Sequence, residues 1–130
     1  MSHKLKIILI VILLLGLGGF LSFQKLNNDL EHLKDDQFEP LNPSQWTDGV
    51  YLGEASQLPI KVIVELNIQD QRITKLTLLE HQTGEGQSAE AILDHVLNAQ
   101  SLAVDVITGA TYSSVLILKA IENALEKAVE

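Results

Sequence analysis

The chain is organised around the stretch Asp105-Val106-Ile107-Thr108-Gly109-Ala110-Thr111-Tyr112-Ser113-Ser114. An apolar run from Leu102 to Ile107 predicts an extended segment before a turn of small and hydroxylated residues, Thr108 to Thr111. After the turn, apolar residues recur at three- and four-residue spacing and so share one helical face: Ile117, Ile121, Ala124, Leu125 and Ala128. The N-terminus of a helix presents orphan backbone N–H groups and a partial positive charge. The stretch is therefore suited to bind a phosphate group at the start of this helix.

Two interpretations of this turn follow from its residues. Gly109 suits a tight turn, and a Ser or Thr just before a helix most often caps its first turn. Alternatively, a threonine hydroxyl contacts the phosphate or carries it covalently. A short motif of this kind is compatible with both the capping and the phosphate-binding interpretation.

Composition limits the chemistry that the chain can perform. In 130 residues there is room for one small domain and an anchor. There is no cysteine, which excludes disulfides and Cys-ligated iron–sulfur clusters, so any redox role needs an organic cofactor. The four histidines show no metal-ligand spacing, and no structural metal is predicted. The net charge of −8 makes nucleic-acid binding unfavourable.

The N-terminal segment predicts a membrane anchor. Residues 7–23 contain no charge and are nearly all Ile, Leu, Val, Gly and Phe, enough as a helix to span roughly 25 Å. A cleaved signal peptide is the alternative, but the small-residue pattern that cleavage requires occurs only at Gly16-Leu17-Gly18, inside the apolar run. Lys4 and Lys6 precede the span, so we expect a cytoplasmic N-terminus and an extracytoplasmic domain.

A polar segment follows the anchor. Leu26, Leu30 and Leu33 share one helical face, so the helix is expected to run on before Pro40 and Pro43. The predicted organisation is an anchor over 1–25, a linker over 26–45 and a domain over 46–130.

The domain begins with strands. Asp48-Gly49 is a turn signal before a short strand, Val50 to Leu52, closed by Gly53. A second strand alternates apolar with polar residues from Ile60 to Ile68, and Gln69-Asp70-Gln71 forms the hairpin turn. The third strand, Arg72 to Glu80, changes phase, which predicts a bulge or a late start. Together they predict an antiparallel meander.

A helix is predicted from Ser88 to Ala99. Its apolar stripe comprises Ala89, Ile92, Leu93, Val96 and Leu97. Glu90 lies in the expected first turn, where the helix dipole favours an acid, and His95 points off the stripe to the surface.

The central stretch resembles the flavinylation motif of the FMN-binding domain family. Members include flavin-carrying components of the sodium-pumping NADH:quinone reductase and of related electron-transport complexes. The family pattern is Asp, two variable residues, Ser or Thr, Gly, Ala, Thr. It maps without a gap onto five residues of this chain: Asp105, Thr108, Gly109, Ala110 and Thr111. In the family the last Thr carries FMN through a phosphoester bond, so the resemblance implies attachment at Thr111.

The resemblance covers about residues 47–128. Asp48 to Gly53 match the family's Asp-Gly-x-Tyr-x-Gly opening. Where many members have Glu-Thr-Pro-Gly-x-Gly near the flavin, this chain keeps Thr83, Gly84 and Gly86 but lacks the proline. His81 matches a histidine of other small members. The resemblance implies flavin contacts for His81, Gly84 and Gly86; the alternative for the two glycines is a flexible loop.

Further roles follow from the resemblance. Thr108 and Gly109 would form the turn, and Asp105 would be recognised by the flavin transferase, which uses FAD and magnesium. Ser113 and Ser114 would either hydrogen-bond the phosphate or cap the helix. Trp46 and Tyr51 are expected to pack in the core or its rim, or to place one aromatic ring near the flavin.

We therefore expect an α+β fold, a small antiparallel sheet packed with two or three helices and preceded by one transmembrane helix. The expected function is a single-pass, extracytoplasmic flavoprotein that carries covalent FMN and electrons in a membrane-linked redox chain. Its partners would be a flavin transferase, with FAD as the FMN donor, and membrane redox proteins. No nucleophile–base pair is evident, so no catalytic residue is predicted. The alternatives are an unflavinylated module that binds a protein or peptidoglycan-linked partner, and a reductase with exchangeable FMN.

Overall fold

The computed structural model describes residues 1–34, 38–82 and 86–129, and its two compact units are Met1–His32 and Leu33–Glu130. The first unit consists almost entirely of helix α1 (His3–Lys34), whose last two residues fall in the second unit. Between His3 and Lys25 it is long and apolar enough to cross a membrane, a property shared by membrane anchors and signal sequences. The helix continues to Lys34, which confirms that it runs on past the apolar segment.

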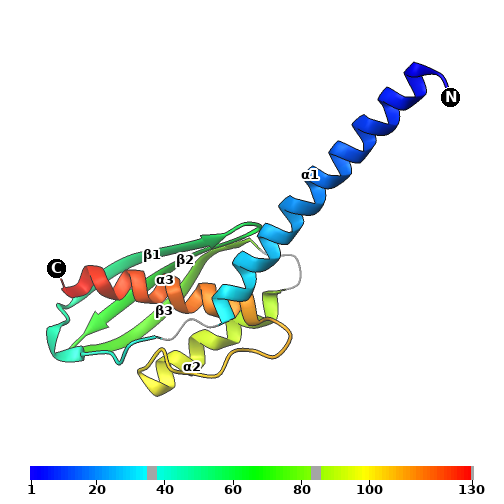
Figure 1. Ribbon diagram of the computed structural model, residues 1–130. Coiled ribbons are helices and arrows are strands. Elements are labelled where there is room, and N and C mark those ends of the chain that lie inside the picture. Colours follow the sequence, from blue (N-terminus) through cyan, green and yellow to red (C-terminus); the bar gives the residue numbers. More distant parts are fainter. Residues whose placement is uncertain (35–37, 83–85, 130) are drawn as a thin grey trace. The chain divides into compact units, whose positions relative to one another are not determined.

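A three-stranded antiparallel meander forms the second unit's sheet, as predicted. The strands β1 (Gly49–Gln57), β2 (Ile60–Gln69) and β3 (Arg72–Gln82) lie in the order β1-β2-β3 (Figure 1). Asp70 and Gln71 join β2 to β3 with φ of 52° and 58°. Positive φ at both central residues is the requirement of a type I′ turn, which matches the twist of a hairpin.

One face of the sheet is buried. On β2, Val62, Val64 and Leu66 are fully buried, as the alternation predicted. Of the two alternatives predicted for β3, the structure has the bulge and not the late start, because β3 begins at Arg72. Asn67 pairs with Lys75 while Ile68 pairs with Ile73, which leaves Thr74 as the extra residue. That extra residue is what returns Ile73, only 3% exposed, to the covered face.

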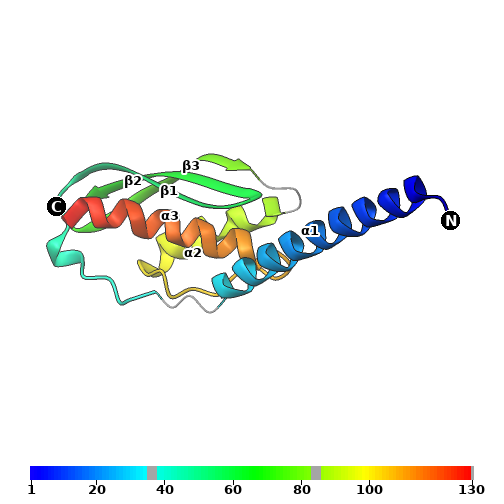
Figure 2. The ribbon, with the colours of Figure 1, turned by 45° about the horizontal axis from the view of Figure 1, so that its top comes forward.

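Three helical elements cover the buried face. They are the 3₁₀ helix η2 (Gly86–Ala91), α2 (Ile92–Ala99) and α3 (Thr111–Val129), and Figure 2 shows α2 and α3 on the same side of the sheet. The predicted helix over 88–99 thus begins with a 3₁₀ turn. Its apolar stripe is buried at Ala89, Ile92 and Val96. His95 is exposed, as expected.

Strand β1 differs from its prediction because it continues through Gly53 to Gln57. A Cβ atom at Gly53 would overlap the carbonyl oxygen of Ala120 and lie 2.7 Å from the backbone N of Ala124. Gly53 therefore does not close the strand. It allows the backbone of α3 to lie directly against β1.

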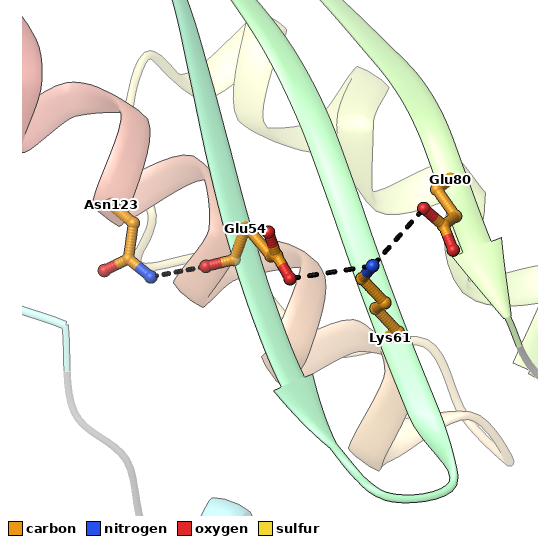
Figure 3. A network of polar contacts seen from close by, with 4 residues as sticks. All are labelled: Glu54, Lys61, Glu80 and Asn123. Carbon is orange, nitrogen blue, oxygen red and sulfur yellow. Dashed lines mark hydrogen bonds and ion pairs between the residues drawn. The ribbon is translucent and has the colours of Figure 1, made fainter.

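Side chains of α3 also cover the outer edge of β1. Lys127 Nζ donates to the carbonyl oxygen of Leu52 at 2.6 Å, and Asn123 Nδ2 donates to that of Glu54 at 2.7 Å. On the uncovered face, Lys61 Nζ lies 3.7 Å from Glu54 Oε1 and 3.6 Å from Glu80 Oε2, a ladder across all three strands (Figure 3). Exposed ion pairs of this kind contribute little stability. The edge contacts matter more, because they occupy backbone groups that would otherwise accept a foreign strand.

Candidate functional site

The turn before α3 is a tight β-turn from Ile107 to Ala110. Ala110 N donates to Ile107 O at 2.9 Å, and Gly109 has a φ of +81°. A positive φ at the third position is what a type II turn requires, and glycine adopts it without strain. The sequence prediction of a glycine turn is confirmed. Thr108 and Gly109 are both exposed, and a Cβ atom at Gly109 would meet nothing within 4 Å.

Ser114 closes this turn from the first turns of the helix. Its Oγ accepts from Ile107 N at 3.1 Å and donates to Ala110 O at 2.7 Å. Ser114 is fully buried, and Ala110 O also accepts from its backbone N at 3.0 Å. The two residues at the ends of the β-turn are therefore bonded to the same side chain.

Thr111 is the first residue of α3, so the N-cap position falls on Ala110. The methyl side chain of Ala110 has no acceptor atom, unlike the Ser, Thr, Asp or Asn residues that usually occupy this position. Capping by Thr111 itself is disfavoured because the residue lies inside the helix. The N-terminus of α3 thus has the backbone donors and dipole of an anion site without a polar cap residue.

The hydroxyl groups near the turn differ in accessibility. Ser113 and Ser114 are buried, Thr108 is exposed and Thr111 is half-buried. Among these four, Thr111 is the one that combines an accessible side chain with a place in the first turn of the helix. Its hydroxyl is the best placed to bear a phosphate held by the helix N-terminus.

The segment 101–110 brings the chain from α2 back to the start of α3 (Figure 1). The apolar run predicted as extended forms no strand between 103 and 107. Leu102 is 1% exposed and anchors the run in the core. Asp105 is exposed, so its carboxylate is accessible to another protein.

His81 combines a buried ring with one unpartnered nitrogen. It lies opposite Val62 on β2, which places it on the covered face of the sheet, and its side chain is 3% exposed. Nδ1 lies 3.2 Å from Glu90 Oε1, whereas Nε2 is buried without a hydrogen-bond partner in the described part of the chain. An unpaired buried nitrogen is costly, so Nε2 is a position open to a ligand group.

The residues that follow β3 lie in and before the 3₁₀ helix η2. Glu90 belongs to η2 rather than to the first turn of α2, where Asp94 takes the place predicted for it. Gly86 begins η2, and η2 packs against α3. Gly84 lies outside the described residues. The structure thus brings the η2 segment against α3, next to the strand end that bears His81.

Trp46 and Tyr51 lie near the C-terminal end of α3, away from Thr111. Thr47 N donates to Ala128 O at 2.9 Å, and Tyr51 Oη donates to Thr47 O at 2.8 Å. Ala128 is about 25 Å along the helix from Thr111 at 1.5 Å per residue. Trp46 is 7% exposed and packs in the core. These contacts support the packing interpretation of Trp46 and Tyr51, not the one that places an aromatic ring near the flavin.

The opening motif has structural roles that sequence patterns did not reveal. Asp48 Oδ1 accepts from Asp70 N at 2.9 Å and so fixes the β2–β3 turn. Tyr51 bonds back to Thr47, and Gly53 admits α3. These residues organise the sheet, and the candidate site lies elsewhere.

A groove of about 350 Å³ also lies at the C-terminal end of α3. Its walls include Glu39, Glu122 and Glu126, together with Trp46. Three carboxylates and a helix C-terminus repel a phosphate. No group of three or more His, Asp or Glu side chains suited to a metal ion occurs among the described residues. The N-terminus of α3 remains the candidate anion site.

Comparison with known proteins identifies the family of the chain. A family model described as FMN-binding domain matches residues 57–126, which include most of the sheet, η2, α2, the turn and most of α3. An uncharacterized protein of Treponema pallidum (strain Nichols) is 29% identical over 89 residues, 66% of this chain and 25% of that protein. The chain therefore spans a quarter of the length of this relative.

Proposed function

This chain belongs to the FMN-binding domain family, and on that premise we propose that it carries FMN covalently on Thr111. We further propose that it is a membrane-anchored, extracytoplasmic electron carrier in a membrane-linked redox chain. The observation that carries the first proposal is the start of α3, where Thr111 follows an N-cap alanine and a glycine turn.

The residues at this end of α3 fit an FMN phosphate. The helix N-terminus stabilises negative charge, and the space beside Gly109 is open. Deeper in the fold, His81 Nε2 is a buried polar atom that a hydrogen-bonding group of the cofactor would satisfy. FMN, when bound, supplies reversible electron transfer through its ring system, which this cysteine-free chain cannot supply from its own side chains.

Attachment is a phosphoryl transfer to the Thr111 side chain. The hydroxyl oxygen of Thr111 forms a bond to the riboflavin-side phosphorus of FAD, and the bond from that phosphorus to the bridging oxygen breaks. AMP leaves with the bridging oxygen, and the hydroxyl proton passes to solvent. No electrons change hands in this step. The product is a phosphoester, which makes the chain a phosphoprotein.

The proposed location follows from the N-terminal segment. Lys4 and Lys6 lie at the start of α1, ahead of its uncharged run, which favours a cytoplasmic N-terminus and an external domain. A covalent bond prevents loss of flavin to a large external volume. An anchor raises the effective concentration of the carrier near membrane redox partners.

Covalent flavin distinguishes this proposal from its alternatives. The chain produced together with a flavin transferase should give fluorescence that survives denaturing electrophoresis. Thr111→Ala should lose the signal, and Thr108→Ala, a matched change in the same turn, should keep it. Flavin that is lost on denaturation would indicate a reductase with exchangeable FMN. An absence of flavin would support an unflavinylated binding module.

The topology has its own test. A reporter that is active only outside the cytoplasm should work when fused after Glu130, and protease added to intact spheroplasts should degrade the domain. A domain that resists the protease until the membrane is broken would show the opposite orientation. A mature mass that includes residues 1–25 would support an anchor, and a shorter one a cleaved signal sequence.

A further inference from the structure

We propose that Ser114 is a positioning residue, whose buried hydroxyl holds the turn from Ile107 to Ala110 in the shape in which Thr111 is presented to the flavin transferase. The inference rests on the proposed function, because it takes Thr111 as the acceptor. It assigns Ser114 a role different from contact with the phosphate.

Three hydrogen bonds hold the two ends of this turn, and the two residues between those ends are exposed. Ser114 Oγ bonds Ile107 N at 3.1 Å and Ala110 O at 2.7 Å, and Ala110 N bonds Ile107 O at 2.9 Å. Thr108 and Gly109 lie between these anchor points and are exposed. The Ser114 hydroxyl therefore joins both ends of the turn to the first turns of α3.

The hydroxyl is already committed to these contacts. A serine hydroxyl has one proton to donate, and Ala110 O receives it. Donation from Ser114 to a phosphate would break this bond at a fully buried position. A buried hydroxyl is costly unless it is bonded, and here both contacts lie within the turn that precedes Thr111.

The turn needs such a contact because its own backbone is permissive. Glycine has the widest choice of backbone conformations, and nothing lies within 4 Å of a Cβ atom at Gly109 to restrict the turn from outside. Without the Ser114 hydroxyl, the turn would adopt its present shape for a smaller fraction of the time. Binding to the transferase would weaken by that fraction, while chemistry in the bound complex would be unchanged.

The test measures flavinylation kinetics of the full-length apo chain in detergent. Purified flavin transferase, FAD and Mg²⁺ are supplied, and the initial rate of covalent flavin formation is followed against chain concentration. For Ser114→Ala we expect a KM about tenfold higher, as the loss of a hydrogen bond or two implies, with kcat changed by less than about twofold. Amide exchange at Ile107 should become faster.

Two controls separate positioning from stability. Ser101→Ala removes a hydroxyl that bonds Ala103 N at 3.0 Å in the same segment, away from the turn. Ile68→Val weakens the core beside Gly49, at the other end of the sheet. Both variants should keep the wild-type KM. If Ser114→Ala does not fold, Ser114→Cys takes its place, because a thiol is a poor donor and acceptor.

The outcomes are distinguishable. A wild-type KM in Ser114→Ala, or an equal rise in Ile68→Val, would overturn the positioning role and leave attachment at Thr111 intact. A wild-type chain that accepts no flavin would overturn the proposed function together with this inference.

Discussion

The side chain of Gln100 bonds both backbone polar groups of Ile73. Oε1 accepts from Ile73 N at 2.8 Å, and Nε2 donates to Ile73 O at 2.9 Å. Nε2 also donates to Leu97 O at 2.8 Å, in the last turn of α2. One amide therefore acts as a short piece of strand against the edge of β3 and ties it to the end of α2, where the chain turns back toward Thr111.

Gln100→Ala should destabilise the domain by about 1–3 kcal/mol, because it leaves partly buried backbone groups of Ile73 without partners. Gln100 has a φ of 51°, so glycine relieves backbone strain at the same position. Gln100→Gly should be less destabilising than Gln100→Ala by about 1 kcal/mol. Urea unfolding followed by fluorescence of the single tryptophan, Trp46, measures both. Equal stability of Gln100→Ala and wild type would show that the amide contacts are dispensable.

Gly53→Ala should cost about 3 kcal/mol or more, because the new methyl group meets the backbone of α3 at Ala120 and Ala124. Gly49→Ala is the matched control on the same strand. Its methyl group would lie 3.0 Å from the Tyr51 hydroxyl and meet no backbone atom, so a shift of a few tenths of an ångström in that half-buried side chain relieves the contact. The control should change stability by less than about 1 kcal/mol. Similar losses in the two variants would contradict the close approach of α3 to β1.

Asp105→Asn should sharply reduce flavinylation while altering the free energy of unfolding by no more than about 0.5 kcal/mol, since Asp105 is exposed. Gly109→Val gives the contrast. Its φ of +81° strains a β-branched residue, so that variant should lose stability and flavin together. Thermal unfolding of the apo chain and the yield of covalent flavin are the two measurements. An Asp105→Asn chain as unstable as Gly109→Val would make Asp105 a structural residue.

His81→Leu should separate stability from cofactor binding. It removes a buried nitrogen without a partner, and the carboxylate of Glu90 is exposed enough to be hydrated. The apo chain should therefore be destabilised by less than about 1 kcal/mol. If His81 contacts the flavin, the visible absorption spectrum of the flavinylated variant should shift. An unchanged spectrum would remove His81 from the flavin site.

Local patterns were enough to predict the main elements. The alternation of β2 identified its buried face, and the phase change in β3 predicted a bulge or a late start, of which the structure has the bulge, at Thr74. The turn at Gly109 and the helix after it also depend on residues that are close in sequence. Such features are predictable because a strand or helix period repeats within a few residues.

The features that sequence patterns did not predict depend on contacts between residues far apart in the chain. Gly53 looked like the end of a strand, because nothing near it in sequence indicates that α3 packs on it. Every residue of α3 from Ser113 to Leu118 is buried, because β1, β2, η2 and α2 all contact this helix. An amphipathic pattern detects one buried face only.

The candidate site was also predictable only where its residues are close in sequence. Thr111 and its turn were predictable from a contiguous motif. The bond from Ser114 to Ile107 joins residues seven apart, and the contact from His81 to Glu90 joins residues nine apart in different elements. In both pairs the partners lie in different segments of the fold, Ile107 before α3 and His81 on β3, so no single helical or strand period relates them, and only the folded chain brings them together.

The most direct test of the central claim is tandem mass spectrometry of the peptide that contains Thr108 and Thr111, from chain produced together with a flavin transferase. We predict one FMN phosphoester per chain, with fragment ions that place it on the Thr111 oxygen and leave Thr108 unmodified. An unmodified peptide, or FMN on any residue other than Thr111, would contradict the account.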